Sequence, residues 1–239
     1  MSEWVEHAGW WLQEVAEDPI YRLDVLPLAT ELAGEIDGIS LDLGCGEGQL
    51  MRCVPGRVVG CDISDKLLTV ASASGPVVRN RLPDLGWLRT AVVEVAFAVM
   101  VFEHLSDMRL FEATARVVRP GGALVLVMNH PAFTADGAGP IMDQVDGEFL
   151  WRWGRYFDEA TVRMSSGDRL ARVVTFYHRP LATILNAAAA SGWTLDRFVE
   201  RGFSNEAIAA QPGYVGQEQM PRLLGARWVN TQGGRTSGR

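Results

Sequence analysis

The chain has 239 residues, of which 48% are hydrophobic and 21% are charged, a balance typical of globular proteins and too apolar for a disordered one. Its 22 basic and 29 acidic residues give a formal net charge of −7, which argues against a protein that binds the phosphate backbone of nucleic acids. The length predicts one large domain, or one domain that carries an insertion.

The first forty residues are predicted to be helical, because their large apolar residues recur at about helical spacing. The start Met1-Ser2-Glu3-Trp4 lacks the basic residues and apolar run of a secretory signal, so no such signal is expected. We expect residues 1–38 to form a helical lid over the rest of the domain.

From Ile39 onward, short apolar runs alternate with helical segments, which is typical of βαβ units and a parallel sheet. Ser106 is a candidate N-cap for an amphipathic helix that Val118 completes and Pro120 stops. The candidate strands are Ile39–Leu43, Arg57–Asp62, Val77–Arg79, Val92–Val99 and Ala123–Met128.

After Asn129 this alternation breaks for about fifty residues that are rich in aromatic side chains. We therefore divide the chain into a sheet domain (39–130 and 180–230), an inserted substrate cap (131–179) and a disordered tail (231–239). The later elements expected are strands Thr161–Met164 and Leu170–His178 around a turn at 165–168, helix Leu181–Ala190, and closing strands Thr194–Glu200 and Leu223–Asn230.

The strongest local pattern is LDLGCGEG at 41–48, a strand followed by three glycines at alternate positions. Glycine lets the backbone turn sharply and lets a ligand approach the main chain. A nicotinamide or flavin site would use G-x-G-x-x-G and place a pyrophosphate on bare helix N–H groups. Asp42 and Glu47 would repel a pyrophosphate, so the charge favours a cationic ligand such as an ammonium or a sulfonium.

Asp62 ends the second candidate strand, eighteen positions after Gly44. An acid at this place in a βαβ unit can accept both ribose hydroxyls of an adenosine. The alternative is that Asp62 or Ser64 caps the following helix. Beside the glycine loop, we favour the ribose interpretation.

Four motifs, LDLGCGEG, VVGCDIS, VFEHL and RVVRPGGALVLVMNHP, resemble in this order the class I S-adenosylmethionine-dependent methyltransferases. The resemblance covers Tyr21 to Met128 by motif, and 181–200 more loosely. It implies an α/β, Rossmann-like, doubly wound sheet of seven mostly parallel strands with a reversed final hairpin. It also implies that S-adenosyl-L-methionine binds over the carboxyl ends of the first strands.

The resemblance also implies residue roles. The glycine loop would hold the methionine part of the cofactor, Asp62 the ribose, and Ile63 the adenine. The acid that usually follows strand three is missing, and Asn80 could accept from the adenine amino group instead. Glu94 replaces the usual aspartate of strand four, so the acids expected around the cationic cofactor are Asp42, Glu47, Asp62, Glu94 and Glu103. The cofactor-binding residues expected are Tyr21, Asp42, Gly44, Cys45, Gly46, Gly48, Asp62, Ile63, Asn80, Leu82 and Glu103.

Methyl transfer is an in-line displacement, so positioning of the reactants can supply roughly 7–11 kcal/mol of the barrier. A general base adds about 10²–10⁴-fold where the acceptor is a hydroxyl. His104 and His130 follow strands four and five, at the edge where ligands of open α/β sheets bind. Either histidine could be the base, and either could instead be a structural residue.

The aromatic residues of the N-terminal segment and of the insertion suggest a lid over a flat apolar acceptor. The alternative is that they only pack the lid on the sheet. The acceptor-binding residues expected are Trp10, Trp11, His130, Phe133, Trp153 and Tyr156.

Cys45, Cys53 and Cys61 show no C-x-x-C spacing, so we expect free thiols, no metal and a cytoplasmic location. We expect a methyltransferase with a small-molecule acceptor, oxygen being the favoured atom and nitrogen or carbon remaining open. It would be a monomer or homodimer that binds neither nucleic acid nor membrane. One alternative is a catalytically degenerate protein that binds the cofactor for sensing or assembly. A nucleotide-dependent oxidoreductase is the other, and the glycine spacing disfavours it.

Overall fold

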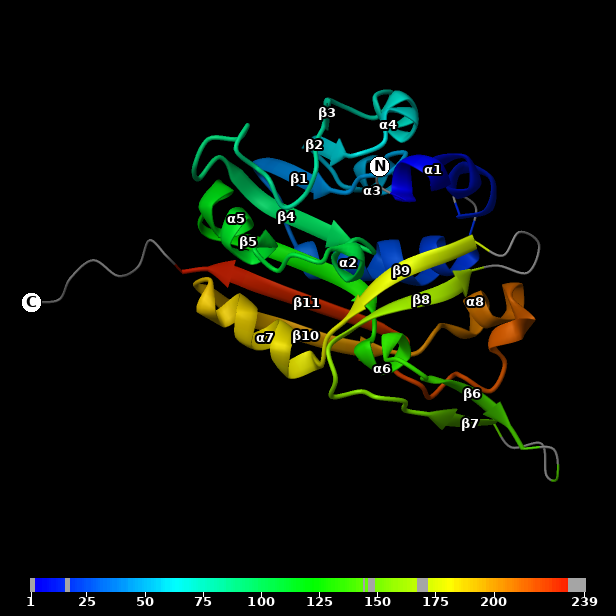
Figure 1. The fold of residues 1–239 in the computed structure, drawn as a ribbon. Coiled ribbons are helices and arrows are strands. Elements are labelled where there is room, and N and C mark those ends of the chain that lie inside the picture. The colour runs from blue at the N-terminus through cyan, green and yellow to red at the C-terminus, as the bar shows by residue number, and fades with distance from the viewer. Residues whose placement is uncertain (1–2, 16–17, 144, 146–148, 167–171, 232–239) are drawn as a thin grey trace, which may run out of the picture.

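The computed structural model describes residues 3–15, 18–143, 145, 149–166 and 172–231. Its centre is a seven-stranded sheet in which β1 to β5 pair in parallel, and β11 runs antiparallel to both β5 and β10 (Figure 1). The strands in spatial order are β3 (Val77–Arg79), β2 (Arg57–Asp62), β1 (Ile39–Leu43), β4 (Val93–Val99), β5 (Val118–Asn129), β11 (Leu223–Asn230) and β10 (Trp193–Arg201). The doubly wound sheet with a reversed final hairpin is therefore confirmed.

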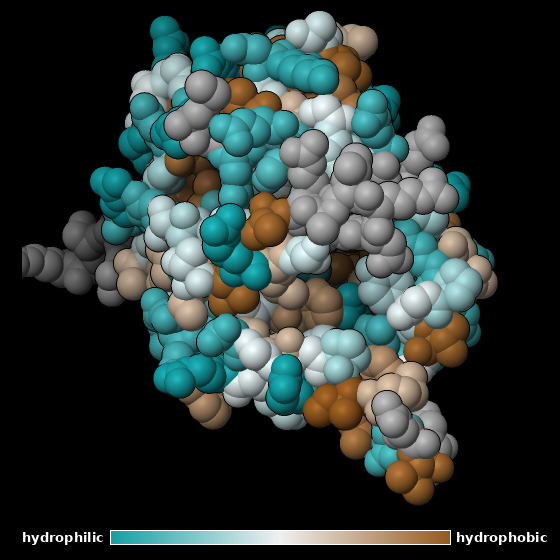
Figure 2. Space-filling view, turned by 45° about the vertical axis from the view of Figure 1, so that its right-hand side comes forward, coloured by the Kyte–Doolittle hydropathy of each residue, from teal (hydrophilic) through white to brown (hydrophobic). Residues whose placement is uncertain are grey.

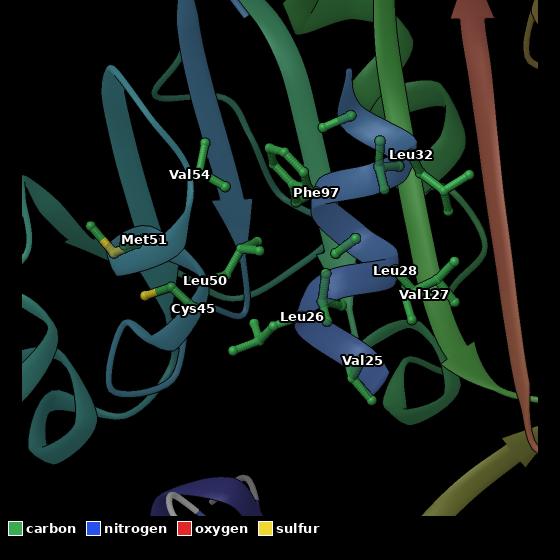
Figure 3. Packing of buried hydrophobic residues seen from close by; sticks show 14 of the residues in the cluster. Val25, Leu26, Leu28, Leu32, Cys45, Leu50, Met51, Val54, Phe97 and Val127 are labelled. Carbon is green, nitrogen blue, oxygen red and sulfur yellow. The ribbon is translucent and has the colours of Figure 1, made fainter. Parts of the chain in front are cut away.

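Helices cover both faces of this sheet. On one face, α2 (Leu26–Ala33) and α3 (Gln49–Cys53) pack against the strand side chains. On the opposite face, α5 (Leu110–Val117) and α7 (Leu181–Ala190) do the same. Figure 3 shows Leu28 and Leu32 of α2 beside Val127 of β5. Burial of such a leucine contributes about 1.5–3 kcal/mol. A Cβ on Gly225 of β11 would lie 2.8 Å from Leu32, so this glycine lets α2 approach the sheet.

The N-terminal segment is helical, as predicted. It comprises α1 (Glu3–Trp10), two short π-helical turns at Trp11–Val15 and Tyr21–Val25, and then α2. Helix α1 contacts α4 (Asp65–Ala71), so it lies over the edge of the sheet that carries the carboxyl ends of β1 and β2 (Figure 1).

The segment after β5 contains a short helix, α6 (Pro131–Thr134), and two hairpins. The second hairpin, β8 (Ala160–Ser166) with β9 (Arg172–His178), matches the predicted pair of strands. Of the predicted turn at 165–168, Ser165 and Ser166 belong to β8 instead, and 167–168 lie outside the described residues. The first hairpin, β6 (Gly139–Met142) with β7 (Phe149–Arg152), was not predicted. It projects from the body of the protein and exposes apolar side chains (Figure 2). The elements α8 (Asn205–Ala210) and the 3₁₀ turn Pro212–Tyr214 precede β11, and residues 232–239 of the predicted tail lie outside the described residues.

Two local predictions are wrong. Helix α5 begins at Leu110 rather than after Ser106, because the Asp107 carboxylate accepts from the Arg109 N–H at 2.9 Å and makes the turn before the helix. The helix ends at Val117, and Val118 already belongs to β5. The backbone around Pro120 therefore continues a strand instead of stopping a helix.

In the part of the chain that the structure describes, no helix is long and apolar enough to span a membrane.

Candidate active site

A cavity of about 460 Å³ opens at the carboxyl edge of the sheet. Its wall comes from the segments that follow β1, β2, β3 and β4, and from α1 and β9. The predicted cofactor residues that line it are Tyr21, Gly44, Cys45, Gly46, Asp62, Ile63, Asn80 and Leu82. Trp11 and His104 line it as well.

The glycine loop joins β1 to α3 and forms part of this wall. Its backbone requires glycine, because φ is +70° at Gly44, +55° at Gly46 and +88° at Gly48. A Cβ on Gly44 would also lie 2.5 Å from a methyl group of Val101. Gly48 does not line the cavity, and it serves the turn into α3 instead.

Asp62 organises this wall through backbone hydrogen bonds. Its Oδ2 accepts from the Gly46 N–H at 3.1 Å and its Oδ1 from the Ser64 N–H at 2.8 Å. Burial raises the pKa of Asp62 in spite of these bonds. The Ser64 hydroxyl accepts from the Leu67 N–H and caps α4, so the capping role belongs to Ser64 and leaves Asp62 facing the cavity.

Three buried carboxylates lie close enough to Tyr21 of the cavity wall to act on its charge, and the described residues supply little positive charge to balance them. Asp42 is 2% exposed, Glu47 4% and Glu103 1%. Each has one oxygen without a hydrogen bond among the described residues, namely Asp42 Oδ2, Glu47 Oε1 and Glu103 Oε2. The cation closest to them in the ion pairs of the described chain is Arg52, 3.9 Å from Glu47 Oε1.

Titration reflects this excess of buried acid. Burial, with smaller contributions from Asp62 and Glu47, raises the pKa of Asp42 to about 8. Burial and the negative charges of Asp42, Glu47 and Glu103 raise the pKa of Tyr21 well above its ordinary value. A cation bound beside these groups would relieve the repulsion, whereas an anion would increase it.

Asp42 and Glu103 lie behind the wall rather than in it. Glu103 Oε1 accepts from both the backbone N–H and the side-chain amide of Asn129, at 3.1 Å each, and so ties the segment after β4 to the end of β5. Both residues were predicted to bind the cofactor, and the structure places them where their charge acts on the cavity without lining it.

Glu94 lies at the opposite edge of the sheet, which corrects the expectation that it surrounds the cofactor. It accepts from the Asp37 N–H at 3.1 Å and from Arg119 at 2.7 Å. Glu94 is the second residue of β4, and the amino end of this parallel strand lies at the edge away from the cavity.

His104 lies in the cavity wall, on the short helical turn Phe102–His104. Its Nδ1 is 2.8 Å from the carbonyl oxygen of Thr175, and its ring lies 4.8 Å from that of Trp4 and 4.6 Å from that of Phe176. Because a carbonyl only accepts, Nδ1 carries the proton. With Nδ1 as the donor, Nε2 is the ring nitrogen left to accept a proton, as a general base requires.

His130 is not in the cavity wall, and both its ring nitrogens are engaged. Nδ1 accepts from the Ala132 N–H at 3.1 Å and thereby caps α6, and Nε2 bonds Glu200 at 2.7 Å. Burial lowers the pKa of His130, and Glu200 partly offsets this effect. The expectation that His130 acts as a base or contacts the acceptor in this cavity is therefore corrected.

The predicted acceptor residues separate into different places. Trp11 lines the cavity, and its indole N–H donates to Glu47 at 2.5 Å. Trp10 does not line it, and Phe133 and Trp153 line a second, smaller cavity. Tyr156 lines neither, and its hydroxyl accepts from the Leu181 N–H at 3.3 Å.

Several wall residues were missed. Glu3 of α1 accepts from both the N–H and the hydroxyl of Thr175, at 3.0 and 2.8 Å, so α1 and β9 close the cavity together. Tyr177, two residues further along β9, also lines it. Met100 follows β4 with a φ of +53°, a strained conformation for a side-chain-bearing residue. No local signal in the sequence marks these residues.

Residues 41–126 match the family described as a methyltransferase domain. An uncharacterised methyltransferase of Emericella nidulans is 29% identical over 135 residues, or 45% of this chain and 47% of that protein, so the chain spans about half the length of that curated relative. The crystal structure of an S-adenosylmethionine-dependent methyltransferase from Mesorhizobium loti is similar at 28% identity and a TM-score of 0.74, covering 85% of this chain and 96% of the other. A methyltransferase of this type from Clostridium acetobutylicum shares the fold at 12% identity and a TM-score of 0.61, covering 95% and 99% of the two chains.

Proposed function

We propose that the chain is a class I S-adenosylmethionine-dependent methyltransferase, and that it transfers a methyl group to a small organic acceptor, with oxygen as the acceptor atom. The observation that supports the cofactor assignment is the group of buried carboxylates, Asp42, Glu47 and Glu103, each with an oxygen that no group in the described part of the chain hydrogen-bonds. The sulfonium and ammonium of S-adenosylmethionine would supply the missing positive charge beside them. The residues present therefore fit this cofactor.

The chain's own residues divide the work of holding the cofactor. Gly44 and Gly46 would let the methionine part approach the backbone, and Asp62 would accept the ribose hydroxyls. Ile63 and Leu82 offer apolar contacts for the adenine. Asn80 lines the same part of the wall, but its Nδ2 donates to the Asp84 carbonyl, which leaves Oδ1 as the acceptor for the adenine amino group.

When bound, the cofactor supplies a methyl carbon that is activated by positive sulfur. The protein's part is to hold the acceptor in line with that carbon, to exclude water and to take up a proton. Helix α1 and strand β9, joined by Glu3 and Thr175, cover the cavity and would exclude water. His104 Nε2 would take the proton from an acceptor hydroxyl.

The size and charge of the site support a small acceptor. A cavity of about 460 Å³ is within the usual range of small-molecule sites, and cofactor and acceptor would share it. We infer that the inserted segment 131–179 caps the acceptor through Thr175 and Tyr177 of β9. The net charge of −7 supports an acceptor other than a nucleic acid.

The direct test combines binding with turnover. Calorimetry should show that the full chain binds S-adenosylhomocysteine, and mass spectrometry should show addition of a methyl group to a member of a panel of phenols, quinols, alcohols and amines. Cofactor binding without any methylated product, even from cell extracts, would favour the catalytically degenerate alternative. Binding of NADH without S-adenosylmethionine would contradict the proposal.

Affinity for S-adenosylmethionine is expected to rise with pH up to about 8. The raised pKa of Asp42, about 8, leaves its carboxyl largely protonated at pH 7 in the free protein, and the positive cofactor favours the ionised form. Binding near pH 7 should therefore release protons. Calorimetry in buffers of different ionisation enthalpy measures this release directly.

The same pKa sets a stability trend for the free protein. A carboxyl whose pKa is higher in the folded than in the unfolded protein stabilises the fold at low pH, and this contribution is lost as the pH rises from about 4 through about 8.

Two variants test the proton release on cofactor binding. Asp42→Asn should abolish it. Asp37→Asn should retain it, because Asp37 is exposed at the opposite edge of the sheet. Heats independent of the buffer, together with a flat affinity between pH 6 and 8, would show that Asp42 does not respond to the cofactor.

A further inference from the structure

A second cavity, of about 180 Å³, lies between the insertion and the segment that leads into β11. Its wall consists of Ala132 and Phe133 of α6, Trp151 of β7, Trp153, and residues 219–222. It shares no lining residue with the first cavity, at the carboxyl edge of the sheet, which we call the methyl-transfer cavity after its proposed function. The proposed function leaves this cavity without a role.

The charged residue of this wall is Arg222, which is only 3% exposed. Its guanidinium carbon lies 3.5 Å from the ring centroid of Phe133, 4.8 Å from that of Phe203 and 5.1 Å from that of Tyr214. One terminal nitrogen donates to Gln217 at 2.8 Å, and the buried Nε lacks a hydrogen-bond partner among the described residues. The guanidinium is thus buried among aromatic rings with a donor left over.

No carboxylate in the described part of the chain forms an ion pair with Arg222. Glu200 is engaged by His130, and Glu218 accepts from the Gly216 N–H. Burial lowers the pKa of Arg222 to about 10, an effect that the Tyr214 phenol partly offsets, so the group remains charged at neutral pH. Aromatic faces offset part of the cost of burying this charge, but a buried cation that no carboxylate of the described residues pairs with still favours an anionic ligand.

We propose that the second cavity binds a small aromatic carboxylate, with Arg222 providing the positive charge. Phe133 and Trp151 stack at 5.3 Å with an angle of 20° between their planes, and with Trp153 they give the cavity flat apolar surfaces. The volume corresponds to roughly six water molecules at about 30 Å³ each, which limits the ligand to about one ring. A single cation in an apolar wall suits a monocarboxylate better than a multiply charged phosphate.

Charge keeps this ligand apart from the cofactor. The buried acids around the methyl-transfer cavity would repel an anion, whereas Arg222 would repel a sulfonium. The two sites should therefore bind independently, and this inference does not depend on the identity of the acceptor.

The test is calorimetry of the full chain with benzoate, neutral benzamide and inorganic phosphate, with and without saturating S-adenosylhomocysteine. We expect benzoate to bind, benzamide to bind at least about tenfold more weakly, and phosphate not to bind, because the ion pair and the flat wall are both needed. Saturation with S-adenosylhomocysteine should leave the benzoate affinity unchanged. Absence of benzoate binding, equal binding of benzamide, or phosphate binding as tight as benzoate would overturn the proposal.

Variants locate the site. Arg222→Gln should weaken benzoate binding at least about tenfold, and Arg119→Gln, which loses an ion pair at the far edge of the sheet, should leave it unchanged. Trp153→Ala provides a second measure if Arg222→Gln fails to fold, because Trp153 is 58% exposed and its loss spares the core. We expect it to weaken benzoate binding several-fold. Wild-type affinity in either folded variant would place the ligand elsewhere.

Discussion

Asp62→Asn is expected to weaken S-adenosylhomocysteine binding about 100-fold or more. A hydrogen bond to a charged group contributes about 1.5–3 kcal/mol, and the proposed ribose contact makes two of them. The carboxylate also accepts from the Gly46 and Ser64 N–H groups, and an amide can accept at only one of its two terminal atoms. The substitution therefore removes ribose contacts and loosens the loop that supports the methionine part.

Asp65→Asn is the matched control, three residues away at the start of α4. The Asp65 side chain is 71% exposed and pairs with Arg79 at 3.4 Å, so its loss should leave the affinity unchanged. Calorimetry measures the affinity, and circular dichroism checks that both variants are folded. A folded Asp62→Asn variant that binds within threefold of the wild type would contradict the ribose assignment.

The sheet could be predicted where a strand is a continuous apolar run. Ile39–Leu43 and Arg57–Asp62 begin and end where the sequence pattern indicates, because these strands are buried and bounded by polar residues or glycine. The hairpin Gly139–Met142 with Phe149–Arg152 escaped prediction because its side chains are largely exposed and its apolar residues do not alternate in a way that marks a core. The apolar pattern around Val118 fits the end of a helix. Its place in a strand depends on pairing with the distant residue Val93, which the local sequence does not reveal.

The residues of the candidate site also differ in how far the local sequence predicts them. The glycine loop, Asp62 and His104 could be found because each follows its strand directly, and the carboxyl ends of parallel strands share one edge. Thr175 reaches the cavity only because β9 folds back beside His104, a contact across 71 positions that no local pattern encodes. For His130, the position after its strand predicted a place in the cavity wrongly. The chain turns into α6 immediately after β5, so the two ring nitrogens of His130 bond the Ala132 N–H and Glu200 instead.

His104→Asn is expected to lower kcat for a hydroxyl acceptor by about 10²–10⁴-fold, the range a general base contributes. Asparagine can keep the hydrogen bond to the Thr175 carbonyl through its amide nitrogen, but it offers no basic lone pair in place of Nε2. Affinity for S-adenosylhomocysteine should remain near that of the wild type. The dependence of kcat on pH should change as well, because the group that takes up the proton is lost.

His130→Asn separates catalysis from stability. His130 caps α6 and pairs with Glu200 outside the cavity, so its replacement should lower the Tm and leave kcat and the pH profile unchanged. Asparagine can itself cap α6, so the loss of stability comes from the hydrogen bond to Glu200, and a hydrogen bond to a charged group contributes about 1.5–3 kcal/mol. If His104→Asn kept the wild-type kcat and pH profile, proton removal would lie with another group. If His130→Asn abolished turnover in a folded protein, His130 would take part in the reaction, and the acceptor would have to extend from the cavity that His104 lines to His130. The pair of variants thus distinguishes a histidine that takes a proton from one that only supports the fold, which the position of either histidine after its strand cannot do.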